Sequence, residues 1–193
     1  MNAEKLKKIL TDHKVWLESG KRRGKRADLS GADLNCADLT GADLNCADLT
    51  GADLSYTDLT GADLSYTDLS YTDLRGANLY RAYLSYTDLT GASLHNANLH
   101  SADLRNANLN GADLRGADLY YADLTGANLI RADLSGAHLS GVHLNRADLT
   151  GAHFELEFKS VRYFRNAIFS EAAIPWVILN PRWSEYADSV KFA

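Results

Sequence analysis

Residues 27–44 read ADLSGADLNCADLTGADL, and this five-residue pattern continues through most of the chain. A leucine stands at every fifth position from Leu29 to Leu149, and Phe154 takes the same slot. A small residue, usually Ala, lies two positions before each leucine, and Asp or Asn usually lies one position before it. The unit A-(D/N)-L-x-x is repeated twenty-six times across residues 27–154. A strict short period of this kind indicates a solenoid.

A five-residue period fits neither regular secondary structure. On a helix, steps of five residues rotate by about 140°, so the leucines would not form one stripe. On a strand, successive leucines would point to opposite faces. Within one unit, however, the Ala and the Leu would share a face while the Asp between them points away. The next two residues must turn the chain, and glycines such as Gly31 and Gly41 stand where a positive φ is often needed. We therefore predict a chain wound into a tube, with leucines inside and Asp outside.

The repeated stretch resembles the consensus of the pentapeptide-repeat family over about two-thirds of the chain. The resemblance implies an all-β solenoid, a right-handed quadrilateral parallel β-helix with four pentapeptides per turn. At a strand spacing of about 4.8 Å, the regular part would be a rod roughly 30 Å long. Leucines twenty residues apart would stack in columns. We assign to the structural core the column Leu29, Leu49, Leu69, Leu89, Leu109, Leu129 and Leu149, together with Phe154.

The start of such a tube would expose an open core and needs a cover. Residues 1–26 are expected to supply it, as an amphipathic capping helix followed by a basic joint. Apolar residues from Leu6 to Leu17 have helical spacing. Asn2 is the expected N-cap and Ser19–Gly20 the expected stop.

The other end keeps the five-residue phase after the consensus is lost. Phe164, Phe169 and Ile174 still fall on the grid, while Glu157 and Lys159 occupy inward slots. We interpret residues 155–176 as a degenerate final coil. Residues 177–193 are an apolar tail with a short helix from about residue 184. This tail either caps the rod or forms a homodimer interface, a role that C-terminal elements often have in the family.

Charge is distributed unevenly along the chain. Residues 1–26 carry nine Lys/Arg against three Asp/Glu, whereas residues 27–154 carry seventeen Asp against six Arg. An anionic rod resembles duplex DNA, and some members of the family bind DNA gyrase as DNA mimics. Alternatively, Asp is simply the consensus residue and bonds locally, and the later arginines interrupt the acidic surface. The candidate acidic surface comprises the ten aspartates before Arg75: Asp28, Asp33, Asp38, Asp43, Asp48, Asp53, Asp58, Asp63, Asp68 and Asp73.

Tyrosines in the middle coils form a second candidate surface. Cross-strand packing explains such residues adequately, but tyrosine is also favoured in protein interfaces. The candidate interaction patch comprises Tyr56, Tyr66, Tyr71, Tyr80, Tyr83 and Tyr86.

The sequence carries no catalytic signature, and we expect no enzyme, cofactor or metal site. Cys36 and Cys46 would lie on opposite faces, too far apart for a disulfide, and two free thiols suit a reducing compartment. The histidines His138, His143 and His153 would lie around corners from one another, too far apart for one tetrahedral site.

These observations favour a non-enzymatic scaffold that binds an unidentified protein partner. The alternative is a DNA-mimicking modulator of DNA gyrase, a type II topoisomerase. The sequence has no signal-peptide core and no apolar run long enough to span a membrane, so we expect a cytoplasmic protein without membrane binding. The basic joint at residues 21–26 is expected to be solvated, without direct nucleic-acid contact.

Overall fold

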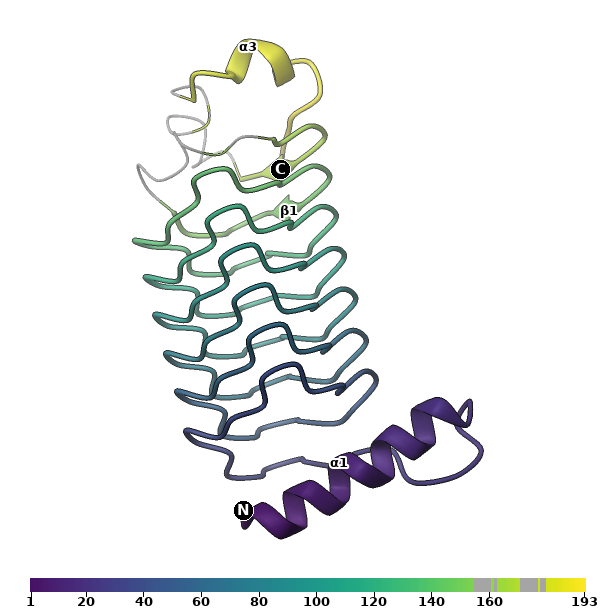
Figure 1. Cartoon of the computed structure of the whole chain (residues 1–193). Helices are drawn as coiled ribbons and strands as arrows, with labels where there is room; N and C mark the ends of the chain where they lie inside the picture. The colour runs from purple at the N-terminus through teal and green to yellow at the C-terminus, as the bar shows by residue number, and fades with distance from the viewer. Residues whose placement is uncertain (155–160, 162, 171–176, 178–179) are drawn as a thin grey trace.

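The chain forms an elongated coil with a helix at each end (Figure 1). The structure is a computed structural model that describes residues 1–154, 161, 163–170, 177 and 180–193. Helix α1 (Ala3–Glu18) lies across the N-terminal end of the coil. Helix α3 (Trp183–Tyr186) lies at the opposite end, as expected for a short helix near residue 184. Glu157, Lys159 and Ile174 lie outside the described residues.

The coil has four sides and advances by one layer every twenty residues. Parallel bridges join each residue before a leucine to its counterpart twenty residues later, from Asp28↔Asp48 to Asp133↔His153. We label the sides by their leucines in the first coil (residues 27–46): side I holds Leu29, side II Leu34, side III Leu39 and side IV Leu44. This register confirms the predicted tube of four pentapeptides per turn.

Each side ends in a β-turn. The N–H of the small residue donates to the carbonyl of the leucine three positions earlier, as from Ala32 to Leu29 at 3.0 Å. The second turn residue has positive φ in every unit from 31 to 151. Glycine suits this conformation, yet thirteen of these positions hold another residue, among them Tyr66 and Tyr86. The predicted positive φ is therefore present in all units, including those without glycine.

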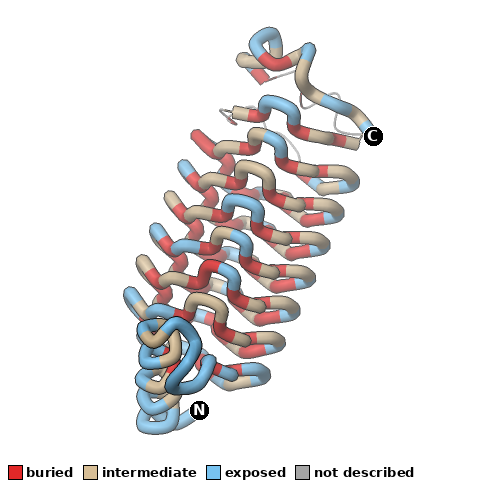
Figure 2. The backbone as a smooth tube through the Cα atoms, turned by 90° about the vertical axis from the view of Figure 1, so that its right-hand side faces the viewer, coloured by how far each residue is buried: buried red, intermediate tan, exposed pale blue. Residues whose placement is uncertain are grey.

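The leucines and the small residues form the buried core of the tube. Figure 2 shows buried residues recurring in every coil. Every leucine from Leu29 to Leu149 is at most 3% exposed. Buried threonines replace Ala without leaving a polar group unpaired, because Thr67 Oγ1 donates to the carbonyl of Leu44 in the coil below at 2.8 Å. The hydroxyl of Thr57 bonds the carbonyl of Leu34 in the same way.

Helix α1 packs against the open end of the first coil. The Asn2 side chain accepts the N–H of Lys5, and Ser19 is the C-cap, as the sequence predicts. Leu6, Ile9 and Leu10 pack against the core but remain partly exposed.

The C-terminal end retains the five-residue phase. Strand β1 (Asp148–Leu149) pairs in parallel with β2 (Ile168–Phe169), which places Phe169 one layer above Leu149. A strand that the sequence did not predict, β3 (Lys191–Phe192), pairs in parallel with β2 and adds one more layer. Tyr186 packs on the ring of Phe164, with centroids 4.7 Å apart. Tyr186 and β3 therefore both contact the last described layer of the tube.

Candidate functional site

The ten aspartates of the candidate acidic surface lie on all four sides, and each accepts a hydrogen bond within its own turn. In the unit 62–66, four of the five backbone N–H groups donate to backbone carbonyls, one within the turn and three to neighbouring coils. The fifth, that of Ser65, donates to Oδ1 of Asp63 at 2.9 Å. An equivalent bond is present at all ten aspartates. One carboxylate oxygen therefore completes the hydrogen bonding of the turn, and Oδ2 remains for other contacts.

Exposure distinguishes the first coil from those above it. Asp28, Asp33, Asp38 and Asp43 are exposed, whereas the aspartates from Asp48 to Asp73 are half-buried between neighbouring coils. Hydrogen bonds from the hydroxyl and N–H of Ser30 lower the pKa of Asp28, and bonds from Thr40 lower that of Asp38. Both groups therefore remain ionised at neutral pH, and the strongest concentration of accessible carboxylates lies at the N-terminal end.

Arginines pair with aspartates in the later coils. Arg75 Nε lies 2.8 Å from Oδ1 of Asp73, and Arg105 makes the same contact with Asp103 at 2.8 Å. Arg115 binds Asp113 and also approaches Asp133 at 3.8 Å. These pairs interrupt the acidic surface from the third coil onward.

The predicted tyrosine patch is divided among the four sides of the tube, because its members do not share one position in the twenty-residue coil. Tyr66 and Tyr86 lie at the corner after side IV and stack face to face, with centroids 5.0 Å apart and planes 1° from parallel. Tyr83 lies on side IV itself. These three side chains are each more than 50% exposed, and together we call them the tyrosine face.

The remaining tyrosines of that set lie elsewhere. Tyr56 and Tyr71 occupy the corners after sides II and I, where their rings cover Gly76 and Gly91 of the next coil. Tyr80 lies at the corner after side III.

Side III carries an aromatic column that the sequence analysis missed. His100 lies between Tyr80 and Tyr120, with centroid separations of 5.4 and 5.0 Å. Tyr121 packs edge-on against Tyr120 at 4.3 Å. The twenty-residue spacing of positions 80, 100 and 120 was a signal that could have identified this column.

The described residues show no grouping of three or more His, Cys, Asp or Glu side chains that could hold a metal ion. Cys36 and Cys46 are both free thiols. None of the helices in the described part of the chain is long and apolar enough to cross a membrane.

Comparisons with known proteins identify the family. The profile named Pentapeptide repeats matches residues 25–61, 57–96, 92–129 and 127–155, with eight copies. No protein among the curated ones matches the chain.

The chain is similar to solved pentapeptide-repeat structures. One, from the Arabidopsis thaliana thylakoid lumen, is 31% identical with a TM-score of 0.49, over 49% of this chain and 66% of that one. Rfr23 from the cyanobacterium Cyanothece 51142 is 31% identical with a TM-score of 0.48, over 77% of this chain and 97% of that one. QnrB1, a plasmid-mediated fluoroquinolone resistance protein, is 19% identical with a TM-score of 0.47, over 80% of this chain and 88% of that one. With its family profile matched across residues 25–155, the chain belongs to the pentapeptide-repeat family and has its right-handed quadrilateral β-helix fold.

Proposed function

We propose that this pentapeptide-repeat scaffold is a non-enzymatic module that binds a partner protein through the tyrosine face. The observation that carries the proposal is the parallel stack of Tyr66 and Tyr86, which holds two large apolar side chains in a fixed position outside the tube. Binding a partner then costs little side-chain entropy, and exposed tyrosine is favoured in protein interfaces. The free thiols of Cys36 and Cys46 support a cytoplasmic location as part of this proposal.

Backbone conformation adds a second argument. Tyr66 and Tyr86 both have φ of +59°, a region where a residue with a Cβ is disfavoured relative to glycine by roughly 1 kcal/mol. Tyr56 and Tyr71 share this conformation, but their rings cover glycines of the next coil and so have a structural role. The tyrosine face covers no such glycine, so partner binding accounts for its tyrosines better than packing does.

Photocrosslinking in the native host tests the proposal. A benzoyl-phenylalanine at position 83 should crosslink to a discrete partner, and Tyr66→Ser with Tyr86→Ser should abolish that product. The same crosslinker at position 56, on the corner after side II, is the matched control. Equal products from both positions, or a product that persists in the double variant, would contradict the proposal.

A second candidate function is DNA-mimicking modulation of a type II topoisomerase such as DNA gyrase. The four exposed aspartates of the first coil, below six further aspartates without an intervening arginine, favour it. Changing Asp28, Asp33, Asp38 and Asp43 together to Asn provides a matched test, because Asn retains the oxygen that bonds the turn but removes the charge.

The assay is inhibition of purified DNA gyrase supercoiling at two salt concentrations. A DNA mimic should inhibit at submicromolar protein, more strongly at low salt, and the Asn variant should lose this inhibition. No inhibition at tens of micromolar protein would leave the tyrosine-face proposal as the function to pursue.

A further inference from the structure

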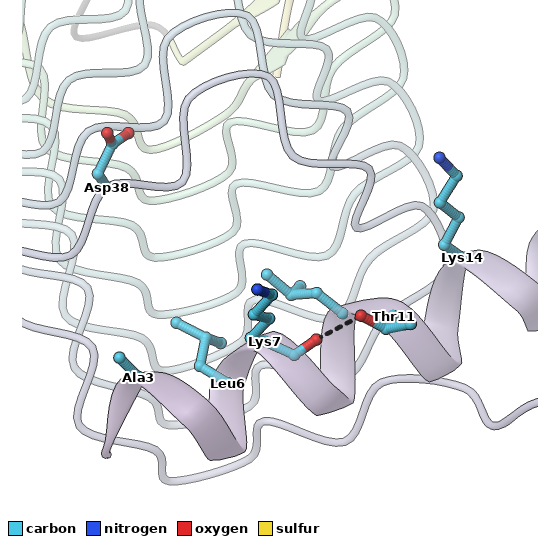
Figure 3. A pocket seen from close by; sticks show the side chains of 7 residues that line it. Ala3, Leu6, Lys7, Thr11, Lys14 and Asp38 are labelled. Atoms are coloured by element: carbon cyan, nitrogen blue, oxygen red, sulfur yellow. Dashed lines mark hydrogen bonds between the residues drawn. The ribbon is translucent and has the colours of Figure 1, made fainter.

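A groove runs between α1 and side III of the first coil (Figure 3). It is a shallow, open groove with a volume of about 430 Å³, and most of its lining is apolar. Leu6 and Leu10 of α1 contribute apolar side chains, Lys7 and Lys14 line it from the same helix, and Asp38 comes from the coil. Figure 3 shows the Lys14 side chain rising from α1 alongside the coil, while Lys7 lies nearer the start of the helix.

The coil presents an unpaired strand edge to this groove. In the coil above, the N–H of Asp58 donates to the carbonyl of Ala37, and the N–H of Leu39 donates upward to the carbonyl of Asp58. The first coil has no coil beneath it. Within the described residues, the backbone N–H and C=O of Asp38 accordingly form no hydrogen bond. A free strand edge of this kind is a template for another extended segment.

Helix α1 replaces the missing lower coil incompletely at this side. Ala37 is only half-buried, whereas Thr57, its counterpart one coil above, is fully buried. Leu39 is 3% exposed, whereas Leu59 above it is 0% exposed. On this side α1 therefore leaves part of Ala37 uncovered beside the apolar side chains of Leu6 and Leu10. Each coil of the tube supplies a small side chain and a leucine to its neighbour at this place.

The charged side chains beside the groove indicate which charge a bound segment would carry. Lys7 and Lys14 stand two helical turns apart and are both exposed. Lys7 forms no ion pair within the described part of the chain, and Lys14 approaches Glu18 only at 3.9 Å, between exposed groups. Lys7 and Lys14 outnumber Asp38, the one carboxylate among the lining residues. Acidic residues of a bound segment are therefore favoured beside the two lysines and disfavoured opposite Asp38.

We propose that this groove binds an extended acidic and apolar segment of a partner protein, which adds to the edge of side III as a β-strand. The backbone of the segment pairs with the N–H and C=O of Asp38. A small and a leucine-sized side chain pack against Leu6 and Leu10, and acidic side chains on either side pair with Lys7 and Lys14. Strand addition to a free sheet edge is an established way in which proteins bind peptides. This site lies at the end of the tube and is independent of the tyrosine face.

The probe is a fluorescent synthetic peptide, acetyl-Glu-Ala-Asn-Leu-Glu-Glu, titrated with the full chain and followed by anisotropy. We expect saturable binding with a Kd below about 1 mM. Lys7→Glu with Lys14→Glu should weaken binding at least about tenfold. The control, Lys8→Glu with Arg22→Glu, makes the same change in net charge on exposed residues outside the groove and should change binding by less than about threefold.

Backbone methylation of the probe separates strand addition from simple charge attraction. Two peptides carry N-methyl groups on one or the other alternate set of amides, because only one set faces the strand edge. One peptide should lose binding and the other should retain it.

Three outcomes would overturn the proposal. One is no saturable binding, and another is equal binding of both methylated peptides. The third is concentration-dependent self-association that the Lys7/Lys14 variant removes, since the occupant would then be a second copy of this chain. Binding to the tyrosine-face variant should be unchanged, so failure here is distinguishable from failure of the proposed function.

Discussion

The imidazole Nδ1 of His13 accepts a hydrogen bond from the backbone N–H of Ala27 at 3.0 Å, and this bond ties α1 to the first residue of the tube. The side chain is fully buried and stacks on Trp16, with centroids 5.5 Å apart. Because Nδ1 must be unprotonated to accept this bond, the imidazole is neutral in the folded state. Within the described residues, no atom meets hydrogen-bond geometry with its buried Nε2, although the Asn45 backbone is near enough to influence the ring.

This arrangement predicts a pH dependence of stability. Burial lowers the pKa of His13, opposed by the nearby Asp43 carboxylate and the Asn45 carbonyl and assisted by the Arg26 charge. The unfolded state therefore takes up the proton first, at a pKa of about 6.5, and stability falls as the pH decreases from about 7 to about 5. Urea midpoints at the two pH values should show this loss. His13→Gln should reduce the difference, whereas the exposed His138→Gln should leave it unchanged.

The aspartates of the turns should stabilise the fold through their hydrogen bonds more than through their charge. Asp63→Ala removes the acceptor of the Ser65 N–H and should lower the free energy of unfolding by about 1 kcal/mol. Asp63→Asn retains an acceptor oxygen and should stay within about 0.5 kcal/mol of the original protein. Urea denaturation of both variants measures the difference. Equal losses in the free energy of unfolding for the Ala and Asn variants would show that the charge of Asp63, and not its hydrogen bond, stabilises the turn.

Acid stability should depend on the arginine pairs. Hydrogen bonds from the Arg115 side chain lower the pKa of Asp113. A carboxylate with a lowered folded-state pKa stabilises the fold above its unfolded pKa of about 3.9, and this contribution is lost as the pH falls through the folded value. Arg115→Gln should therefore raise the pH at which the protein unfolds in acid. Circular dichroism from about pH 5 to about pH 2 would test this, and an unchanged transition would contradict it.

Two glycines with the same backbone conformation should differ in their tolerance of alanine. Gly51 and Gly76 have φ of +64° and +63°, but a Cβ at Gly51 would meet nothing within 4 Å. At Gly76 the added carbon would lie 2.7 Å from the Tyr56 ring, so that ring must move. Gly51→Ala should cost roughly 1 kcal/mol and Gly76→Ala more. Adding Tyr56→Ala should remove most of the excess cost, measured as a double-mutant cycle in urea.

The interior leucines should tolerate neither truncation nor charge. Leu84 is 0% exposed, so Leu84→Ala should lower the free energy of unfolding by about 2–5 kcal/mol. Leu84→Lys places a charge in the core and should unfold the middle coils, as followed by amide hydrogen exchange. A native-like melting curve for the lysine variant would contradict the assignment of leucines to the interior.

The sequence predicted most of the tube because the same five-residue pattern gives the same local backbone geometry in every unit. In an extended segment alternate side chains point to opposite faces, so the Ala and Leu of each unit point inward and the Asp between them points outward. The interior residues can therefore be identified from their position in the five-residue unit. The twenty-residue turn, taken from the family resemblance, also suffices to place Tyr66 and Tyr86 in one column and Tyr56 on another corner. Closeness in sequence groups all six tyrosines of the predicted patch, whereas in a coil two residues are neighbours only when their positions within the turn agree.

The tertiary structure alone decided what happens at the ends and along the edges. Strand β3 pairs Lys191 with Ile168, twenty-three residues earlier, a register that depends on the path through α3 and not on the repeat. The burial of His13 depends on where α1 settles on the first coil, a contact between non-repetitive segments. The half-burial of Asp48 and the exposure of Asp28 likewise depend on which coils have neighbours. A five-residue motif by itself determined the inside and outside of the rod, because both follow from local geometry. The groove beside α1 arises from contacts between segments distant in sequence and outside the repeat, and it required the folded chain.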